Sequence, residues 1–503
     1  MSDRADSGGP WWRDAVVYQV YPRSFQDSDG DGEGDLRGIA ARLEHVRQLG
    51  ADAIWLSPVY PSPMADGGYD VADYEQVDPR FGTLADADAL IAAAHERGLR
   101  LLMDVVPCHT SIEHPWFAEH PERYVWSPRD DGPPNNWIAS FGGPAWSRDP
   151  RTGRWYLHSF YPEQPDLDWR RQDVRDAVAG ALRFWLARGV DGFRLDAVDH
   201  LLKDSQLRDD PPASAPPVLP EHADAERLEQ IHSRNAPDIG GALAALREAA
   251  GDTLLAGEVY LPWRQLAPYL AHVDCAFAFE LLHAPWEAAA IRAAIAAALQ
   301  DDSSGEQVAW VLSNHDFPRL PDRVGARNAR AAAMLSLTLP GAVFVYQGDE
   351  LGMADGPGGD PPHDRAGRDR HRHPMRWDDD LPHGDFTVSE AQPWLPAIAV
   401  AGGGVAQQRT DPDSILHLYR DLIALRRTLG AGLTFLGEDE GVADGVLAYR
   451  RGDEHLVALN LGDEPRPAPS AGRVLRRTHA ARTPAGLAAP VQLLPGEGFL
   501  AMI

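Results

Sequence analysis

The stretch Gly192-Phe-Arg-Leu-Asp196, continuing Ala-Val-Asp-His200, is a short apolar run that ends in charged and polar side chains. The same pattern recurs seven more times along the chain. Near-continuous apolar runs of this length predict strands of a parallel sheet that is buried on both faces. The other runs are AVVYQVYPRSF from Ala15, AIWLSPVY from Ala53, LRLLMDVVPCH from Leu99, LLAGEVY from Leu254, CAFAFELL from Cys275, VAWVLSNHD from Val308 and AVFVYQGDE from Ala342.

Amphipathic helical patterns lie between several of these runs. Strands that alternate with helices predict an α/β protein, and eight such units predict a closed (β/α)8 TIM barrel. An open doubly wound sheet is the alternative. The helical patterns cover Leu36–Leu49, Leu84–Arg97, Asp173–Arg188, Gly241–Ala250, Ala326–Leu337 and Ser414–Thr428.

The pattern divides the chain into three domains. We expect the barrel over residues 10–109 and 173–429. Residues 110–172 are rich in Pro, Trp, Gly and Arg with little periodicity, which predicts a subdomain inserted after the third strand. Beyond Gly430 short alternating runs with turn signals predict a C-terminal all-β sandwich over residues 430–503.

Composition limits the possible partners. The 503 residues include 47 Lys+Arg and 75 Asp+Glu, a net charge of −28, which argues against nucleic acid and anionic membrane surfaces but not against a neutral substrate. The two cysteines, Cys108 and Cys275, lie in apolar runs and are expected to be reduced core residues. With neither a signal sequence nor a long apolar run, we expect a cytoplasmic monomer or homodimer without an organic cofactor.

Acidic residues follow several of the predicted strands. In a (β/α)8 barrel the active site lies at the carboxyl ends of the strands, so these acids are expected to meet there. Residues i and i+2 of a strand face the same side, which places Arg194 and Asp196 together. The remaining candidates at strand ends are Asp104, Glu258, Asp316, His109 and His315.

Two chemistries use such a cluster. One is enolate stabilisation by carboxylate-bound Mg²⁺ with a Lys or His base, and Lys203 is the only lysine of the chain. The other is glycoside hydrolysis by a pair of carboxyl groups. Fifteen tryptophans, many in the irregular segments, favour the second because aromatic rings can stack on sugars, although most of them are expected to pack loops.

Five motifs carry a resemblance to a known family. Asp104-Val-Val-Pro-Cys-His109, Gly192-Phe-Arg-Leu-Asp196, Gly257-Glu258 and Ser313-Asn-His-Asp316 resemble, in order and spacing, the four signature regions of the α-amylase family of glycoside hydrolases (family 13). Gln164-Pro-Asp-Leu-Asp168 is similar to a fifth region, in the form found in the α-glucosidase and oligo-1,6-glucosidase branch. The likeness runs from about Trp12 to the C-terminus.

The resemblance implies catalytic roles. Asp196 would be the nucleophile, Glu258 the general acid/base and Asp316 the acid that holds the sugar 2- and 3-hydroxyls. Arg194 would keep Asp196 ionised, and Asp104 would be a buried support for Arg194. The physics agrees, since a nucleophile must be an anion and a proton donor must stay protonated near neutral pH.

The resemblance also implies substrate contacts. His109 and His315 would bind sugar hydroxyls in the −1 subsite. Asp66 and Arg368 would clamp the 4-hydroxyl of the terminal glucose, and Tyr69 would stack beneath its ring. A charged pair that binds a free 4-hydroxyl rejects a glucose extended there, so we expect cleavage from the non-reducing end.

Linkage preference depends on the residue after the nucleophile. In this branch a valine there goes with α-1,6 preference, and Ala197 therefore favours α-1,4 bonds. The expected activity is that of a retaining α-glucosidase acting on short, maltose-like α-glucosides, with possible transfer of glucose to acceptors other than water. Oligo-1,6-glucosidase, sucrose-active glucosidase and glucosyl isomerase are alternatives within the family. A non-catalytic binding relative would lack carboxylates or carry a membrane span, and this chain does neither.

An acidic loop after the first strand is a candidate metal site. Oxygen ligands alternate with glycines as in a calcium loop, but the twelfth position is Gly38 instead of glutamate. Resemblance to the α-glucosidase branch implies structural Ca²⁺ or Mg²⁺. A calcium site at Cys108 is not expected, because a neutral thiol is a poor ligand for a hard cation. The implied ligands are Asp27, Asp29, Asp31, Asp35 and the carbonyl of Glu33.

Overall fold

The computed structural model describes residues 9–214, 224–300, 305–388, 390–479 and 490–503. Eight parallel strands close into a barrel in the order β1-β10-β9-β8-β7-β6-β3-β2, which confirms the (β/α)8 fold and rules out the open sheet. Each strand coincides with one of the eight apolar runs. They are β1 (Val16–Val20), β2 (Ala53–Leu56), β3 (Arg100–Val105), β6 (Gly192–Leu195), β7 (Leu254–Gly257), β8 (Cys275–Phe277), β9 (Val308–Val311) and β10 (Ala342–Tyr346).

The helices around the barrel lie close to their predicted positions. The pattern predicted over Ala326–Leu337 divides into a 3-10 turn (Ala326–Asn328) and α10 (Ala329–Thr338), and the other five patterns agree with helices within two residues at each end. Those five are α1 (Leu36–Leu49), α2 (Leu84–Glu96), α4 (Gln172–Ala187), α5 (Gly240–Ala250) and α12 (Ile415–Arg426). The others are α3 (Pro115–Glu119), α6 (Ala267–Leu270), α7 (Phe279–His283), α8 (Ala288–Ala298), α9 (Leu320–Val324) and α11 (Val405–Thr410).

Apolar side chains fill the barrel interior beneath the strand ends. Leu102 belongs to a buried cluster with Val17, Trp55 and Phe277, which come from different strands. Because alternate residues of a strand face one side, Asp104 of β3 points the same way as Leu102, one layer nearer the carboxyl end. The apolar layer thus supports a charged layer at the end where barrel enzymes carry their active sites.

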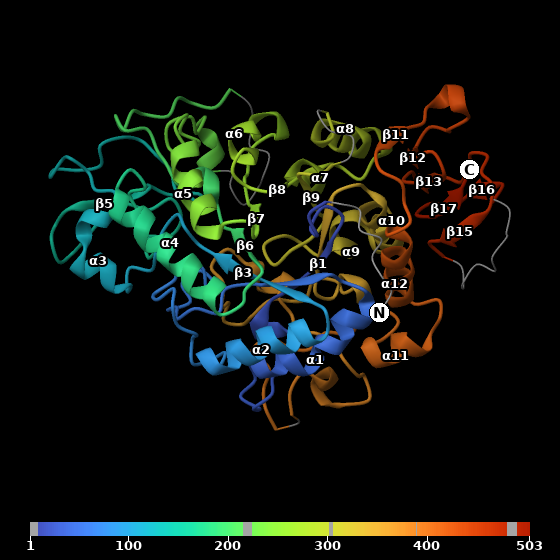
Figure 1. The fold of residues 1–503 in the computed structure, drawn as a ribbon, viewed down its shortest axis with the longest axis horizontal. Helices are drawn as coiled ribbons and strands as arrows, with labels where there is room; N and C mark the ends of the chain where they lie inside the picture. Colours follow the sequence, from blue (N-terminus) through green and yellow to red (C-terminus); the bar gives the residue numbers. More distant parts are fainter. Residues whose placement is uncertain (1–8, 215–223, 301–304, 389, 480–489) are drawn as a thin grey trace.

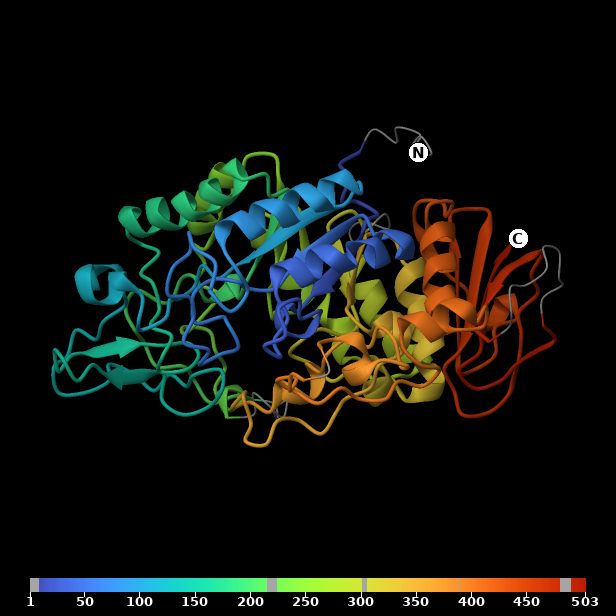
Figure 2. The ribbon, with the colours of Figure 1, turned by 90° about the horizontal axis from the view of Figure 1, so that it is seen from below.

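Two appendages lie on opposite sides of the barrel, at the two ends of the long axis of the molecule (Figures 1 and 2). The segment between β3 and β6 contains α3 and an antiparallel hairpin of β4 (Trp146–Arg148) and β5 (Trp155–Leu157). Sequence analysis missed this hairpin because strands of three residues leave no periodic signal. The C-terminal region forms a five-stranded antiparallel sheet in the order β11-β12-β13-β17-β15 and a two-stranded sheet, as predicted.

The five-stranded sheet packs against α8 and α10 of the barrel. Tyr449 of β12 hydrogen-bonds Thr338 at the end of α10, with 2.6 Å between the two hydroxyl oxygens, and Arg451 donates to the carbonyl of the same threonine. None of the described helices combines the length and the apolar composition needed to cross a lipid bilayer. The sheet strands are β11 (Leu433–Phe435), β12 (Val446–Arg451), β13 (His455–Asn460), β15 (Val474–Arg477) and β17 (Gly498–Met502), with β14 (Arg466–Pro467) paired to β16 (Gln492–Leu493).

Candidate active site

A cavity of about 980 Å³ lies at the carboxyl ends of the barrel strands. Asp196 directly follows β6 and Glu258 directly follows β7, and both line this cavity. Arg194 and His315 are fully buried beneath it. The other candidate residues that line it are Asp316, Asp66, Tyr69, His109 and Arg368.

Arg194 connects the carboxyl groups of the site. Its Nη1 donates to Asp104 Oδ1 at 2.8 Å and to Asp196 Oδ1 at 2.6 Å. Its Nη2 forms an ion pair with Glu258 Oε1. Asp196 and Glu258 therefore contact the two terminal nitrogens of one guanidinium. A cation of the protein itself thus balances these carboxylates, which argues against the alternative of an enolate-stabilising Mg²⁺ held by them.

Three carboxyl groups share this single buried cation. Burial raises the pKa of Asp196 and of Glu258, and it raises that of Asp104 to about 6, while Arg194 opposes each shift. Burial of three carboxyl groups around one cation therefore favours a protonated carboxyl within this cluster. The expectation that Arg194 keeps Asp196 ionised therefore described only one of two opposing effects.

Asp316 has the opposite electrostatic environment. Its Oδ1 accepts hydrogen bonds from Arg368 Nη1 at 2.9 Å and from Arg372 Nη2 at 3.0 Å. Burial opposes its ionisation, but His315, Arg368 and Arg372 outweigh burial and hold the pKa of Asp316 well below its ordinary value. Asp316 is thus an anion suited to accept hydrogen bonds from hydroxyl groups, and it is a poor proton donor.

The inserted subdomain and the loop after β10 both contribute to the lining of the cavity. Arg368 pairs with Asp66, and its guanidinium lies 5.1 Å from the ring centroid of Phe141. Arg365 of the same loop pairs with Glu163 of the insertion at 2.8 Å. Two segments far apart in sequence therefore meet beside the carboxylates.

Tyr69 and His315 form a stacked pair in the wall below the cavity. Their ring centroids are 5.3 Å apart and their planes differ by 10°. The Tyr69 hydroxyl donates to Asp104 Oδ2 at 2.9 Å, which ties the ring to the Arg194 cluster. This arrangement gives Tyr69 a fixed orientation in the cavity.

A family model described as the catalytic domain of α-amylase matches residues 19–431. This chain belongs to the α-amylase family. It is 41% identical to a probable alpha-glucosidase of Rhizobium meliloti, in an alignment that covers 90% of this chain and 90% of that protein. It is 35% identical to an oligo-1,6-glucosidase of Parageobacillus thermoglucosidasius, in an alignment that covers 91% of each. These relatives, together with the family match, make the protein a glycoside hydrolase related to α-glucosidases.

Solved structures share the fold of this chain. The alpha-glucosyl transfer enzyme XgtA superposes with a TM-score of 0.89 at 35% identity, over 98% of this chain and 99% of that one. The trehalulose synthase MutB from Pseudomonas mesoacidophila MX-45 superposes with a TM-score of 0.84 at 31% identity, over 98% of this chain and all of that one. Because these similar folds carry proteins named for different reactions, the fold alone does not assign the substrate specificity of this chain.

Sequence analysis missed several residues of this α-amylase family pocket. Gln164 begins a motif quoted above and Arg372 lies four residues after Arg368, but no role was assigned to either. Tyr260 lies two residues after Glu258, and its hydroxyl is 3.4 Å from Glu258 Oε1; the i+2 spacing was an available signal. Most tryptophans were expected to pack loops, and the described lining of the cavity contains none. Its aromatic residues are Tyr69, Phe141, Phe160, Tyr260, Phe279 and Phe317.

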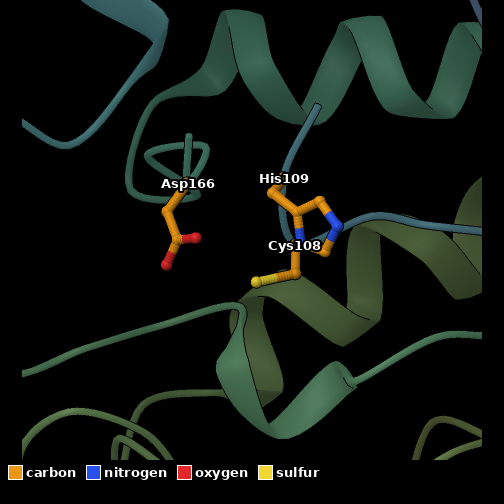
Figure 3. Close-up of side chains that lie close together, drawn as sticks. All are labelled: Cys108, His109 and Asp166. Atoms are coloured by element: carbon orange, nitrogen blue, oxygen red, sulfur yellow. The ribbon is translucent and has the colours of Figure 1, made fainter. Parts of the chain in front are cut away.

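A second buried cluster lies behind the cavity, at the junction with the insertion (Figure 3). Cys108, His109 and Asp166 place possible metal-binding atoms within 4.8 Å of one another. Lys203, however, forms an ion pair with Asp166 and donates to the carbonyl oxygen of His200 at 2.5 Å, with Nζ 3.8 Å from Cys108 Sγ. Burial raises the pKa of the Cys108 thiol, so it remains neutral. The ammonium group supplies the cation here, and these residues do not fit a metal ion.

The acidic loop before α1 fits a divalent cation better. Carboxylate oxygens of Asp27, Asp29 and Asp35 lie within 4.8 Å of one another. Burial and the charges of the neighbouring acids raise the pKa of Asp31, a repulsion that a bound cation would relieve. The Glu33 carboxylate forms an ion pair with Arg23 at 2.5 Å. The ligand expected from the sequence is the backbone carbonyl of Glu33, which this ion pair does not use. Oxygen donors of this kind suit hard cations such as Ca²⁺ or Mg²⁺.

Proposed function

We propose that this protein is a retaining, exo-acting α-glucosidase that releases α-glucose from the non-reducing end of short α-glucosides. The observation that carries the proposal is the contact of Asp196 and Glu258 with the two terminal nitrogens of Arg194 in one cavity. Retaining glycosidases keep their two carboxyl groups about 5–5.5 Å apart, and sharing one guanidinium favours a separation of that order.

The mechanism follows from these positions. Asp196 attacks the anomeric carbon while Glu258 protonates the glycosidic oxygen, which leaves with the aglycone and gives a β-glucosyl-Asp196 intermediate. Glu258, now a carboxylate, takes a proton from water, whose oxygen attacks the anomeric carbon and frees Asp196. An acceptor hydroxyl in place of water gives transglucosylation. Anionic Asp316 would hold sugar hydroxyls whose hydrogen bonds strengthen in the transition state.

The buried pair of Asp66 and Arg368 in the cavity lining supports exo action. Asp66 and Arg368 would bind the 4-hydroxyl of a terminal glucose. A glucose extended at that oxygen has no 4-hydroxyl to offer this buried pair, so it loses these hydrogen bonds and chain interiors are rejected. The names of the Rhizobium and Parageobacillus relatives support the same substrate class.

A substrate panel tests this function. We expect kcat/KM to be higher for maltose than for isomaltose, because the small side chain of Ala197 favours α-1,4 bonds, and we expect starch to be cut only from its ends. NMR should show α-glucose as the first product, and β-glucose would contradict the retaining mechanism. Faster turnover of isomaltose would indicate an oligo-1,6-glucosidase, and isomeric disaccharides made from sucrose would indicate a glucosyl isomerase.

We also propose that the acidic loop binds Ca²⁺ or Mg²⁺ through Asp27, Asp29, Asp31, Asp35 and the Glu33 carbonyl. The role would be structural, because Asp35 also caps α1 by accepting a hydrogen bond from the Gly38 amide. A cation there would neutralise the loop and hold the start of the first barrel helix.

A further inference from the structure

A buried glutamine faces His109, which lines the cavity, and another faces His315, which is buried beneath it. Gln19 Nε2 lies 2.8 Å from His315 Nδ1, and Gln164 Nε2 lies 2.9 Å from His109 Nε2. A side-chain amide nitrogen only donates hydrogen bonds, so each contact requires an unprotonated ring nitrogen on the histidine. The two glutamines come from different parts of the fold, β1 and the inserted subdomain.

The orientation of the Gln164 amide is fixed by the backbone of its own segment. The backbone N–H of Tyr161 donates to the side-chain oxygen Oε1 of Gln164 at 3.0 Å, and the backbone N–H of Gln164 donates to the Tyr161 carbonyl at 2.9 Å. Exchanging the oxygen and nitrogen of the side chain would place two donors face to face. Gln164 Nε2 therefore faces the pocket, where its second hydrogen bonds Asp66 Oδ2 at 2.9 Å.

This arrangement determines the protonation of His109. Because Nε2 accepts from Gln164, the neutral ring carries its proton on Nδ1, and the 3.2 Å contact from Nε2 to the Tyr69 carbonyl is not a hydrogen bond. Burial lowers the pKa of His109 to about 4, in agreement with a neutral ring. Nδ1 is buried without a hydrogen-bond partner among the described residues, and His109 lines the cavity. Its N–H is thus available to a bound ligand.

We propose that Gln164 is a positioning residue: it sets which nitrogen of His109 carries the proton and holds Asp66 beside Arg368. The inserted subdomain completes the sugar pocket through this one amide group. The proposal rests on the proposed function for its ligand, the terminal glucose of an α-glucoside. His109 would then offer a hydrogen-bond donor, and Asp66 an acceptor, to hydroxyls of the same ring.

A Gln164→Glu substitution keeps the shape of the side chain and reverses this hydrogen bonding. The new carboxylate accepts from Nε2–H, which moves the proton of neutral His109 away from Nδ1. It also adds a negative charge to a ring that already faces Asp66, Asp166 and Lys203, and so raises the pKa of His109. Protonation below that pKa restores Nδ1–H, so the alkaline limb of the pH–rate profile should move to lower pH.

Kinetics with 4-nitrophenyl α-glucoside test the substitution. We expect kcat/KM at neutral pH to fall about 100-fold, with a larger rise in KM than fall in kcat. The reason is that the hydrogen bonds which Gln164 donates to His109 and Asp66 are lost and an acceptor replaces the donor. Gln164→Met removes both donors without adding charge, and should lower kcat/KM while leaving the alkaline limb in place.

Gln172→Glu is the matched control. Gln172 is exposed at the start of α4, and its Nε2 lies 2.8 Å from Asp176 Oδ1, so the same change of amide to carboxylate occurs beside an aspartate far from the pocket. Its kinetics should equal those of the wild type. A folded Gln164→Glu enzyme with the kcat/KM and pH profile of this control would overturn the proposal. A fall in kcat/KM that is fully explained by partial unfolding, as shown by a lower Tm, would overturn it too.

Nitrogen NMR of the enzyme labelled with ¹⁵N-histidine provides a test that does not require turnover. The His109 signals, assigned by their loss in His109→Asn, should show a protonated Nδ1 in the wild type and a protonated Nε2 in Gln164→Glu. A protonated Nε2 in the wild type would refute the proposal. A wild type that hydrolyses no α-glucoside would instead refute the proposed function, and the NMR result would stand separately.

Discussion

Arg194 and Lys203 are both buried cations, and their surroundings differ. Arg194 contacts three carboxyl groups, and two of these line the cavity. Lys203 has one carboxylate partner, Asp166, and a backbone carbonyl, so its charge is balanced and enclosed. An excess of buried negative charge keeps a proton available for chemistry, whereas a balanced pair only holds elements together.

The largest effect should come from the nucleophile. Asp196→Asn should reduce kcat roughly 10⁴-fold or more, since the covalent step loses its attacking group. The free energy of unfolding should be unchanged or higher, because one of three repelling carboxyl groups is removed. Steady-state kinetics and thermal unfolding of the same sample measure both. Substantial remaining hydrolysis would assign the nucleophile elsewhere.

Glu258→Gln should have the second-largest effect. We expect kcat to fall roughly 10²- to 10⁴-fold for maltose, and less for 4-nitrophenyl α-glucoside, whose leaving group needs no proton. The pKa of Glu258 is raised by burial, and its protonated form is the active one, so wild-type activity should fall as pH rises through that pKa. The variant should lose this alkaline limb. A variant that keeps it would show that another group is the proton donor.

Lys203→Met should lower the stability of the protein while changing its activity little, because Lys203 forms a balanced ion pair with Asp166. Removing one partner leaves Asp166 buried and unpaired, which typically costs about 3–5 kcal/mol of unfolding free energy. Urea denaturation measures this cost, and kcat at low temperature should change far less than in Asp196→Asn. The double variant Lys203→Met/Asp166→Asn should recover part of the stability. An unchanged denaturation midpoint in the single variant would contradict the structural role of the pair.

The smallest effect should come from chelation. If the acidic loop holds a dication at 100 times its dissociation constant, removing the ion costs about 2.7 kcal/mol of stability, so EDTA should lower Tm by a few degrees without changing kcat below the transition. Asp27→Asn should abolish the EDTA effect, while Lys203→Met should retain it, because its cation is part of the chain. An EDTA-insensitive Tm in the wild type would argue against the proposed metal.

The barrel and its strand-end acids could be predicted from the sequence because each depends on local pattern. Runs such as that ending in Asp196 have the periodicity and length of buried parallel strands, and closure of eight of them places their ends together. Arg194 and Asp196 on one face followed from the i+2 rule alone. The short hairpin β4–β5 and the absence of tryptophan from the described pocket lining did not follow, since neither leaves a local signal.

Sequence thus determined the type of scaffold, the family and the identity of the carboxyl groups. Only the tertiary structure decided their charges and partners: that Arg194 serves three carboxyl groups, that Lys203 belongs to Asp166, and that Gln164 reaches across from the insertion to Asp66 and His109. Hydrogen bonds and buried Coulomb interactions depend on distances between residues that are far apart in the chain, and no local pattern specifies those distances.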